Sequence, residues 1–252
     1  MSAHVDIRIA DGVMVVSLDR ADKRNALSRD MIGRLAEAMA EAELNGEVRV
    51  VALRGNGPDF CAGADLAELL TSVDQSMEEN EHDALGLGEV FLAMRRLPKI
   101  VVAMVHGRAL AGGAGLATAA DLVVATRSSR FGYPEVERGF VPAMVMTMLR
   151  RSVGEKRAFD LVGTGRIVMA EEALAMGLIS RVIDDADFDQ GCAQLLADLA
   201  SRSLTASALT KQLFTDLDGR DFRDGILLGA RVNAIARRTE DFKRSIAGFL
   251  DK

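Results

Sequence analysis

Residues 100–125 of the chain read IVVAMVHGRALAGGAGLATAADLVVA, and this stretch decides the class of fold. It begins with a continuous apolar run, passes through a glycine-rich step and an alanine-rich segment, and ends in a second apolar run over residues 122–125. Continuous apolar runs of this length are typical of strands that are buried on both faces of a parallel sheet. The order strand, helix, strand therefore predicts an α/β fold.

The same alternation of strand and helix continues towards the amino terminus. Residues 5–9 and 13–18 are β-prone runs joined by a short turn, and residues 48–53 read as another buried strand. Ser28 stands where it can cap a helix between them. A chain of this length can bury a sizeable core without the help of a metal or a disulfide.

The carboxyl-terminal part of the chain has a different sequence pattern, in which helices predominate. Ser152 and Glu155 have the spacing of a capping box, which predicts the start of a helix there. From Asp187 onwards, apolar residues recur mainly at helical spacing. We therefore predict an α/β core over residues 1–190, followed by a helical region over residues 191–252 that is the natural candidate for an oligomer interface.

Composition and charge narrow the classes of function. The 252 residues include 31 Lys and Arg against 37 Asp and Glu, a net charge of −6, and only 4% are aromatic. The sequence has no cluster of basic residues and few aromatic side chains on which bases could stack, so we do not expect nucleic acid as a partner. The two cysteines are typical of a reducing compartment, and the longest strongly apolar run, Ile100–Val105, is far too short to span a membrane. We expect a cytoplasmic protein with no membrane partner.

Several common chemical signatures are missing from the sequence. No serine lies in a Gly-x-Ser-x-Gly elbow, and there is no phosphate-binding Gly-x-x-x-x-Gly-Lys loop. The glycine-rich step also lacks the third glycine of a dinucleotide fingerprint. His4, His82 and His106 are not at metal-ligand spacing. We therefore expect chemistry without a metal, a bound nucleotide cofactor or a catalytic triad.

Two loops rich in small residues follow predicted strands. Residues 60–66 read FCAGADL, and residues 107–116 read GRALAGGAGL. Small residues allow a close approach of the backbone, and the first N–H groups of a helix have no partner within the helix. One such N–H group from each loop could converge on an oxygen that becomes negatively charged in a reaction. Taken alone, the glycines are better explained by tight packing of helix against strand.

A third segment, FGYPE at residues 131–135, makes the function of these two loops easier to interpret. Together with the basic turn DKRNAL at residues 22–27, the three segments resemble the crotonase family, the enoyl-CoA hydratase/isomerase superfamily. The resemblance covers nearly the whole chain. It implies a spiral of ββα turns with a carboxyl-terminal helical tail, assembled into homotrimers or dimers of trimers, and an acyl-CoA thioester as substrate.

The resemblance also implies roles for individual residues. Ala64 and Gly112 match the two backbone N–H donors that polarise the thioester carbonyl, and Glu135 matches one of the two catalytic glutamates of the family. The residues that match substrate-binding or CoA-binding positions are Lys23, Arg24, Ala62, Ala64, Asp65, Leu66, Ala67, Gly112, Phe249 and Lys252. Coenzyme A is part of the substrate in this family, so no separate cofactor is expected. The helical region 191–252 is expected to close the active site as well as to form the oligomer interface.

The chemistry of a thioester agrees with a site made of two backbone N–H donors and one carboxylate. Hydrogen bonds to the carbonyl oxygen stabilise negative charge there and so acidify the neighbouring carbon. A carboxylate placed over the acyl chain can then move protons, and partial burial would raise its pKa towards a useful range. Pro134 restrains the backbone just before Glu135 and helps to fix the direction of that side chain.

The chain departs from the two-glutamate pattern at Gly115, which stands where the second glutamate would be. Hydration by Glu135 with one water is our leading hypothesis, and Δ3,Δ2-enoyl-CoA isomerisation, in which Glu135 alone shuttles a proton, is the alternative. A third possibility is a family member that binds acyl-CoA with low activity. Tyr133, Glu68 and the acidic residues 74–83 are candidates to replace the missing carboxylate, and Gly115→Glu is expected to raise hydration if that carboxylate is limiting.

Two other residues near the loops are expected to have structural rather than catalytic roles. His106 directly precedes the glycine-rich loop, and we expect its ring to hydrogen-bond to nearby backbone rather than to take part in catalysis. Cys61 is expected to be a small buried residue, because nothing near it in sequence would activate a thiolate.

Overall fold

The computed structural model describes residues 4–250. Its main sheet has six strands in the order β1-β2-β3-β4-β6-β9. β1 is antiparallel to β2, and every following pair in this order is parallel. The strands are β1 (Val5–Ala10), β2 (Val13–Leu18), β3 (Val50–Gly55), β4 (Ile100–Val105), β6 (Leu122–Thr126) and β9 (Arg181–Ile183). The buried runs that the sequence predicted as strands are thus strands of one sheet.

A second sheet of three short strands lies in the order β5-β7-β8. Its strands are β5 (Arg108–Leu110), β7 (Arg130–Gly132) and β8 (Ile167–Met169). β5 and β7 are parallel, so the chain leaves both strands at the same edge, just before the glycine-rich helix start and just before Glu135.

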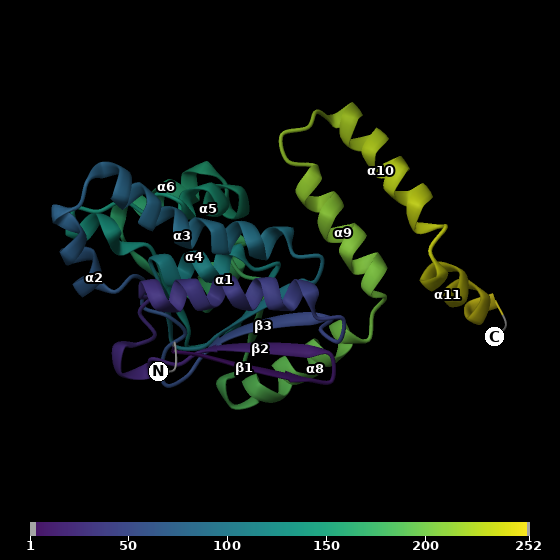
Figure 1. Cartoon of the computed structure of the whole chain (residues 1–252), viewed down its shortest axis with the longest axis horizontal. Helices are drawn as coiled ribbons and strands as arrows, with labels where there is room; N and C mark the ends of the chain where they lie inside the picture. The colour runs from purple at the N-terminus through teal and green to yellow at the C-terminus, as the bar shows by residue number, and fades with distance from the viewer. Residues whose placement is uncertain (1–3, 251–252) are drawn as a thin grey trace.

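Helices cover both faces of the main sheet, as Figure 1 shows. They are α1 (Arg29–Leu44), α2 (Leu66–Thr71), α3 (Met77–Arg96), α4 (Gly112–Ala119), α5 (Val145–Val153), α6 (Glu155–Thr164), α7 (Ala170–Met176), α8 (Phe188–Ala200), α9 (Leu204–Asp216), α10 (Phe222–Ala236) and α11 (Glu240–Leu250). The described residues also form four short 3-10 turns, η1 (Ala21–Lys23), η2 (Ser72–Asp74), η3 (Pro134–Arg138) and η4 (Asp185–Asp187).

The strands divide their side chains between two apolar clusters. Val16 and Leu53 point to the larger cluster, under α1, α3 and α4, whereas Val50 and Ala52 point to a smaller cluster under α8. Successive side chains of a strand point to opposite faces, so continuous apolar runs are what a sheet covered on both sides requires.

Capping residues explain where two of the helices begin. Ser28 caps α1 as the sequence predicted, since its hydroxyl accepts a hydrogen bond from the Met31 N–H at 3.3 Å. The predicted helix does start there, since α6 begins at Glu155, but the capping role of Ser152 was wrong, because α5 runs through this residue and its hydroxyl donates to the Met148 carbonyl. Gly154, with a φ of +79°, turns the chain into α6 in its place. A capping box does exist at Ser76, which begins α3 inside the acidic stretch.

The last three helices leave the body of the molecule. Figure 1 shows α9, α10 and α11, in yellow-green and yellow, extending to one side of the sheet and its helices. α10 and α11 contain no buried residue, although both are described in full. Large apolar side chains are exposed along these helices, among them Phe214 (75%), Phe222 (87%) and Phe249 (76%). α8, which spans the expected boundary near residue 190, packs against the sheet.

A buried ion pair ties α9 to the body. Lys211, the one buried residue of α9, donates to the Met94 and Lys99 carbonyls at 2.7 and 2.9 Å. Its ammonium also lies 2.7 Å from the Asp121 carboxylate, which accepts the Val101 N–H. Burial lowers the pKa of Lys211 and raises the pKa of Asp121, and their mutual attraction opposes both shifts. The pair therefore depends on both partners being present.

We predict that Lys211→Met destabilises the protein by about 3 kcal/mol, because it leaves a largely buried carboxylate without its cation. This cost is at the lower end of what the loss of one partner of a buried ion pair usually causes, because 29% of the Asp121 side chain is exposed. Equilibrium unfolding in urea measures the change. The matched control is Arg8→Met, which breaks an exposed pair with Asp6 and should cost less than about 1 kcal/mol. Equal costs for the two variants would contradict the anchoring role of Lys211.

Candidate active site

The loops that follow β3 and β4 are joined by backbone hydrogen bonds. The Cys61 N–H donates to the Arg108 carbonyl at 3.0 Å, and the Leu110 N–H donates to the Cys61 carbonyl at 3.0 Å. Because β3 and β4 are parallel, both loops leave the sheet at the same edge, which is where open α/β sheets commonly bind ligands. The two segments that the sequence singled out are therefore neighbours in space.

The N–H group of Ala64 points away from Leu27, the residue with which Ala64 forms a β-bridge. A parallel bridge joins Leu27 and Ala64, made by the Leu27 N–H to the Gly63 carbonyl at 2.7 Å and the Asp65 N–H to the Leu27 carbonyl at 2.9 Å. In such a bridge the bonds come from the two neighbours of the central residue, so the Ala64 N–H points to the other side.

Gly112 presents a second N–H close to the first. It is the first residue of α4, and the first N–H groups of a helix have no partner within the helix. A methyl group built on Gly63 would lie 3.5 Å from the Gly112 nitrogen, and one built on Gly112 would lie 4.0 Å from the Ala64 nitrogen. Two backbone donors thus lie side by side at the positive end of α4.

Glu135 lies in the turn η3, directly after Tyr133 and Pro134. Its side chain is half-buried, and its Oε2 atom is buried without a hydrogen-bond partner in the described part of the chain. Burial raises the pKa of Glu135 above its ordinary value, although Arg138 opposes the shift. A carboxylate with one unsatisfied buried oxygen and a raised pKa is suited to accept and return a proton.

Tyr133 and Gly132 connect the Glu135 turn to the start and the middle of α4. The Tyr133 hydroxyl is 2.9 Å from the Thr118 hydroxyl, and Thr118 in turn donates to the Ala114 carbonyl at 2.7 Å. The Ala111 N–H donates to the Gly132 carbonyl at 2.9 Å. The acid–base candidate and the two backbone donors therefore belong to one hydrogen-bonded unit.

Apolar side chains fill the space at Gly115. A methyl group built on Gly115 would lie 2.2 Å from Cγ1 of Val145 and 3.1 Å from Cζ of Phe91. A glutamate at this position would overlap Val145 before its carboxylate began. This lack of space counts against the expectation that Gly115→Glu raises hydration, which stays a prediction.

The candidates to replace that carboxylate are engaged elsewhere. Tyr133 is fully buried, and burial raises the pKa of its hydroxyl well above the ordinary value. Glu68 accepts the Arg29 N–H at 2.8 Å, at the start of α1. In the acidic stretch, Asp83 pairs with Arg29 and Glu79 closes the α3 capping box. Glu135, by contrast, has a buried carboxylate oxygen without a hydrogen-bond partner in the described part of the chain.

The basic turn at residues 22–27 lies against the Ala62 loop. Lys23 and Arg24 are exposed, and the Ala62 N–H donates to the Arg24 carbonyl at 3.0 Å. Asn25, which the sequence analysis did not single out, is buried and donates to the Asn56 and Asp59 carbonyls at 2.9 and 2.8 Å. The turn thus presents two cations beside the candidate site on a fixed backbone.

The remaining predicted binding residues fall into two groups. Asp65 caps α2 through the Ala67 N–H and pairs with Arg20 at 2.6 Å, and the Arg20 guanidinium holds its pKa below the ordinary value. Leu66 and Ala67 are exposed at the start of α2. Phe249 lies on α11, which Figure 1 shows on the opposite side of the molecule from α2. Lys252 lies outside the described residues.

Other side chains stiffen the loops without touching the donors. Asp59 accepts from Nε and Nη2 of Arg108 at 2.9 Å each, and also from the Arg108 N–H at 3.0 Å. The His106 ring bonds to the Gly57 carbonyl at 2.8 Å, which confirms its structural role. Cys61 is fully buried, as predicted, and burial raises the pKa of its thiol to about 12. An aspartate and an arginine this far apart in sequence gave no signal that they would pair.

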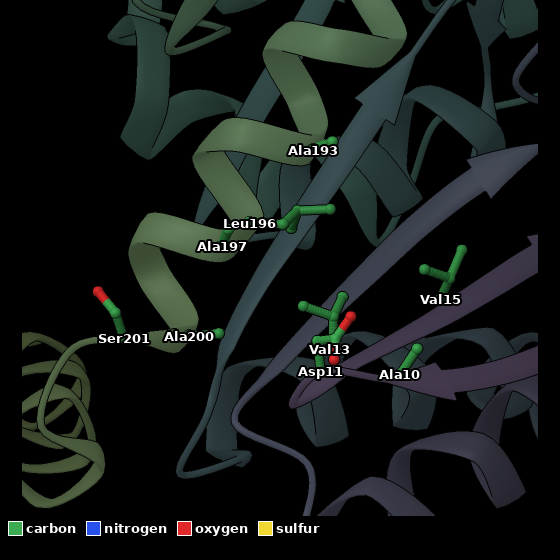
Figure 2. A pocket seen from close by; sticks show the side chains of 9 residues that line it. All are labelled: Ala10, Asp11, Val13, Val15, Ala193, Leu196, Ala197, Ala200 and Ser201. Carbon is green, nitrogen blue, oxygen red and sulfur yellow. The ribbon is translucent and has the colours of Figure 1, made fainter.

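The described structure also has two surface hollows away from these residues. One, of about 470 Å³, lies between the β1–β2 turn and α8, as Figure 2 shows, and has Val13, Leu196 and Ala197 in its wall. The other, of about 710 Å³, lies between α5 and α6. Neither hollow is lined by Ala64, Gly112 or Glu135. Within residues 4–250, no cluster of metal-binding side chains is present and no helix is long and apolar enough to cross a membrane.

The fold and the paired loops define an α/β protein of the crotonase class. The family model for enoyl-CoA hydratase/isomerase matches residues 8–252, so the chain belongs to this enzyme family. A Thermus thermophilus protein provisionally named enoyl-CoA hydratase is 43% identical over 240 residues, 95% of each chain. The short-chain-enoyl-CoA hydratase of Clostridium acetobutylicum is 31% identical over 242 residues, 95% of this chain and 92% of the relative.

Solved structures agree with this assignment of the fold. The crystal structure of an enoyl-CoA hydratase from Mycobacterium smegmatis superimposes with a TM-score of 0.94 at 31% identity and covers 98% of this chain and 96% of its own. Human enoyl coenzyme A hydratase domain-containing protein 3 gives the same TM-score at 28% identity, covering 98% and 97%. The crotonase-like fold with a carboxyl-terminal helical region, expected from the sequence, is confirmed.

We predict that Gly115→Ala destabilises the protein by about 1–3 kcal/mol, because the new methyl group overlaps Val145. Val145→Ala removes the overlapping atom, so the double variant should be more stable than the sum of the two single changes by about 1 kcal/mol. Urea unfolding of the four proteins of this cycle measures the coupling.

The control for this cycle is Gly33→Ala in α1, where nothing lies within 4 Å of the added methyl group. This change should stabilise the protein by about 0.5–1 kcal/mol, as alanine does in a helix. Strictly additive costs at Gly115 and Val145 would contradict the contact.

Proposed function

We propose that the chain is an enoyl-CoA hydratase, which adds water across the C2–C3 double bond of a trans-2-enoyl-CoA. The observation that carries the proposal is the buried, unpartnered Oε2 of Glu135 on a turn that is hydrogen-bonded to α4, the helix that begins at Gly112. Family membership supports acyl-CoA as the substrate class.

In the proposed reaction, the Ala64 and Gly112 N–H groups donate to the thioester carbonyl oxygen and form an oxyanion hole. Glu135 takes a proton from water as the water oxygen bonds to C3, and the electrons of the double bond move into the carbonyl. The two N–H groups stabilise the resulting enolate, and each donor of this kind is typically worth about 2.7–4 kcal/mol. Glu135 then returns its proton to C2. One carboxylate acts first as base and then as acid.

The alternative function is Δ3,Δ2-enoyl-CoA isomerisation, and the apolar filling at Gly115 favours it. Val145 and Phe91 occupy the place from which a second carboxylate would act. Isomerisation needs only one carboxylate, because Glu135 can take a proton from C2 of a 3-enoyl-CoA and deliver it to C4 of the resulting dienolate as the double bond moves to C2–C3. A family member that binds acyl-CoA with low activity is the third outcome to be tested.

Binding of the CoA part is proposed for Lys23 and Arg24, whose cations suit phosphate groups. The exposed residues Leu66 and Ala67, beside Ala62 and Asp65, are proposed to contact the substrate along the start of α2. Phe249 and Lys252 are proposed to contact substrate after assembly. No cofactor other than the substrate's own coenzyme A enters this scheme.

Assembly into a homotrimer or a dimer of trimers is proposed through the region 191–252. Its support is the set of exposed apolar side chains on α9–α11, because such patches on a folded chain usually mark a contact surface. Assembly would also place α11 against another copy and help to close the site. The two buried free thiols fit a reducing compartment, and we propose the cytoplasm.

Assays with a short trans-2-enoyl-CoA and the matching 3-enoyl-CoA, run in parallel, separate these functions. We predict loss of the conjugated-thioester absorbance from the 2-enoyl substrate, as water removes the double bond. Gain of that absorbance from the 3-enoyl substrate alone would establish the isomerase. No change in either assay, with acyl-CoA binding retained, would support the third outcome.

Glu135→Gln is the variant that tests the mechanism in the same assays. It should lower kcat by about 10²–10⁴-fold, because an amide cannot accept the proton, while acyl-CoA affinity is retained. Glu137→Gln, two residues further on and exposed, is the matched control and should leave kcat unchanged. Full activity of Glu135→Gln would contradict the proposed role.

We predict a pH profile in which kcat/KM falls on the acid side with a midpoint above pH 4.5. Burial raises the pKa of Glu135 above this ordinary value, so the carboxylate is protonated, and inactive as a base, at pH values where a free glutamate is still ionised. Steady-state rates over the acid range, with stability checked at each pH, measure the midpoint. A midpoint below 4.5 would contradict the assignment.

A further inference from the structure

Ala111 has a backbone conformation that alanine rarely adopts. Its φ is +51° and its ψ is −127°, directly before Gly112. The other non-glycine residues with positive φ are His4, Asp11, Arg24 and Asn25, all of them polar, and none lies at the start of an α-helix. Alanine has no side-chain hydrogen bond to stabilise such a conformation, so the surroundings must enforce it.

Backbone hydrogen bonds on both sides of Ala111 hold this conformation. The Leu110 N–H donates to the Cys61 carbonyl and the Ala111 N–H donates to the Gly132 carbonyl, which ties the segment to two other chain segments. The Ala111 carbonyl accepts the Gly115 N–H at 2.9 Å, the first hydrogen bond of α4. The turn at Ala111 thus sets the direction in which α4, and the Gly112 N–H, begin.

The methyl group of Ala111 lies against the other loop. A Cβ built on Gly63 would be 2.8 Å from the Ala111 methyl carbon, so the methyl packs directly on the Gly63 backbone. Gly63 has a φ of +100° and immediately precedes Ala64. One small side chain therefore separates the two peptide units whose N–H groups are the proposed donors.

We propose that Ala111 is a positioning residue, whose strained backbone and methyl group together fix the spacing and direction of the Ala64 and Gly112 N–H groups. This inference rests on the proposed function, since it assigns those two N–H groups to one carbonyl oxygen. A glycine here would adopt the same φ without strain and would leave a gap against Gly63. The donors would then be free to move apart, and an oxyanion hole depends on donors held in place beforehand.

Ala111→Gly tests the proposal with a readout that a purely structural role would not change. The probe is butyryl-CoA labelled with ¹³C at the carbonyl, a saturated thioester that cannot be hydrated or isomerised. Infrared spectroscopy of the bound probe measures how strongly the donors polarise the carbonyl. In the unmodified protein we expect a shift to lower frequency, and in Ala111→Gly we expect much of that shift to be lost. We also expect kcat to fall about tenfold, less than the loss of a whole donor, with KM little changed.

Asp11→Gly is the matched control, because Asp11 also has a positive φ of 50° but lies in the β1–β2 turn, away from the site. It should leave both the carbonyl frequency and kcat unchanged. An Ala111→Gly protein with the unmodified carbonyl shift and kcat overturns the inference, even if its thermal stability rises from the relief of strain. Absence of a shift in the unmodified protein overturns the proposed function, and the inference with it.

Discussion

The close contact of four backbone segments, at residues 27, 61–65, 108–111 and 132, is the constraint on which the site depends. Where these segments meet, the glycines leave no room for an added methyl group: one on Gly63, Gly113 or Gly132 would lie 2.8 Å or less from its nearest neighbour. Bonds between backbone atoms join residues 61 and 108–110, residues 27 and 63–65, and residues 111 and 132. Because the proposed donors are themselves backbone N–H groups, the role of the small residues is to bring the peptide units close enough to act on one atom.

Tightly packed loops contain backbone carbonyl groups that accept no hydrogen bond from a neighbouring strand. Buried polar side chains donate hydrogen bonds to these carbonyl groups instead. Asn25 reaches the Asn56 and Asp59 carbonyls, and its own Oδ1 accepts the Arg20 N–H at 2.9 Å. The nearly buried Asp59 carboxylate is paired with Arg108 across the two loops, which holds its pKa below the ordinary value against the effect of burial. A buried polar group without a partner is costly, so these contacts make the loop geometry specific as well as compact.

The sequence predicted the parts of the structure that depend on local pattern. Apolar runs marked the strands, and Ser28 marked the start of α1, because burial on both faces and capping leave signatures within a few residues. The capping box at Ser152 was a false signal, since the same four residues also fit the end of one helix and the turn into the next. The roles of Ala64, Gly112 and Glu135 came from resemblance to a family, and they stay predictions. The methyl of Val145 beside Gly115 and the strain at Ala111 could not be predicted, because each depends on packing between segments distant in sequence.

The apolar filling at Gly115 has a consequence for the proposed chemistry. With Val145 in that space, the proposed mechanism assigns both proton transfers to Glu135, whose turn is hydrogen-bonded to α4. Hydration and isomerisation then share the same base and the same two donors, and each passes through an enolate-type anion: that of a 3-hydroxyacyl thioester in hydration and a dienolate in isomerisation. They differ in what lies within reach of Oε2 of Glu135: a water molecule directed at C3, or the hydrogen on C2 and then the C4 carbon. On the proposed mechanism, access of solvent to that single oxygen atom therefore selects the reaction, and the packing of the turn that carries Glu135 matters as much as the carboxylate itself.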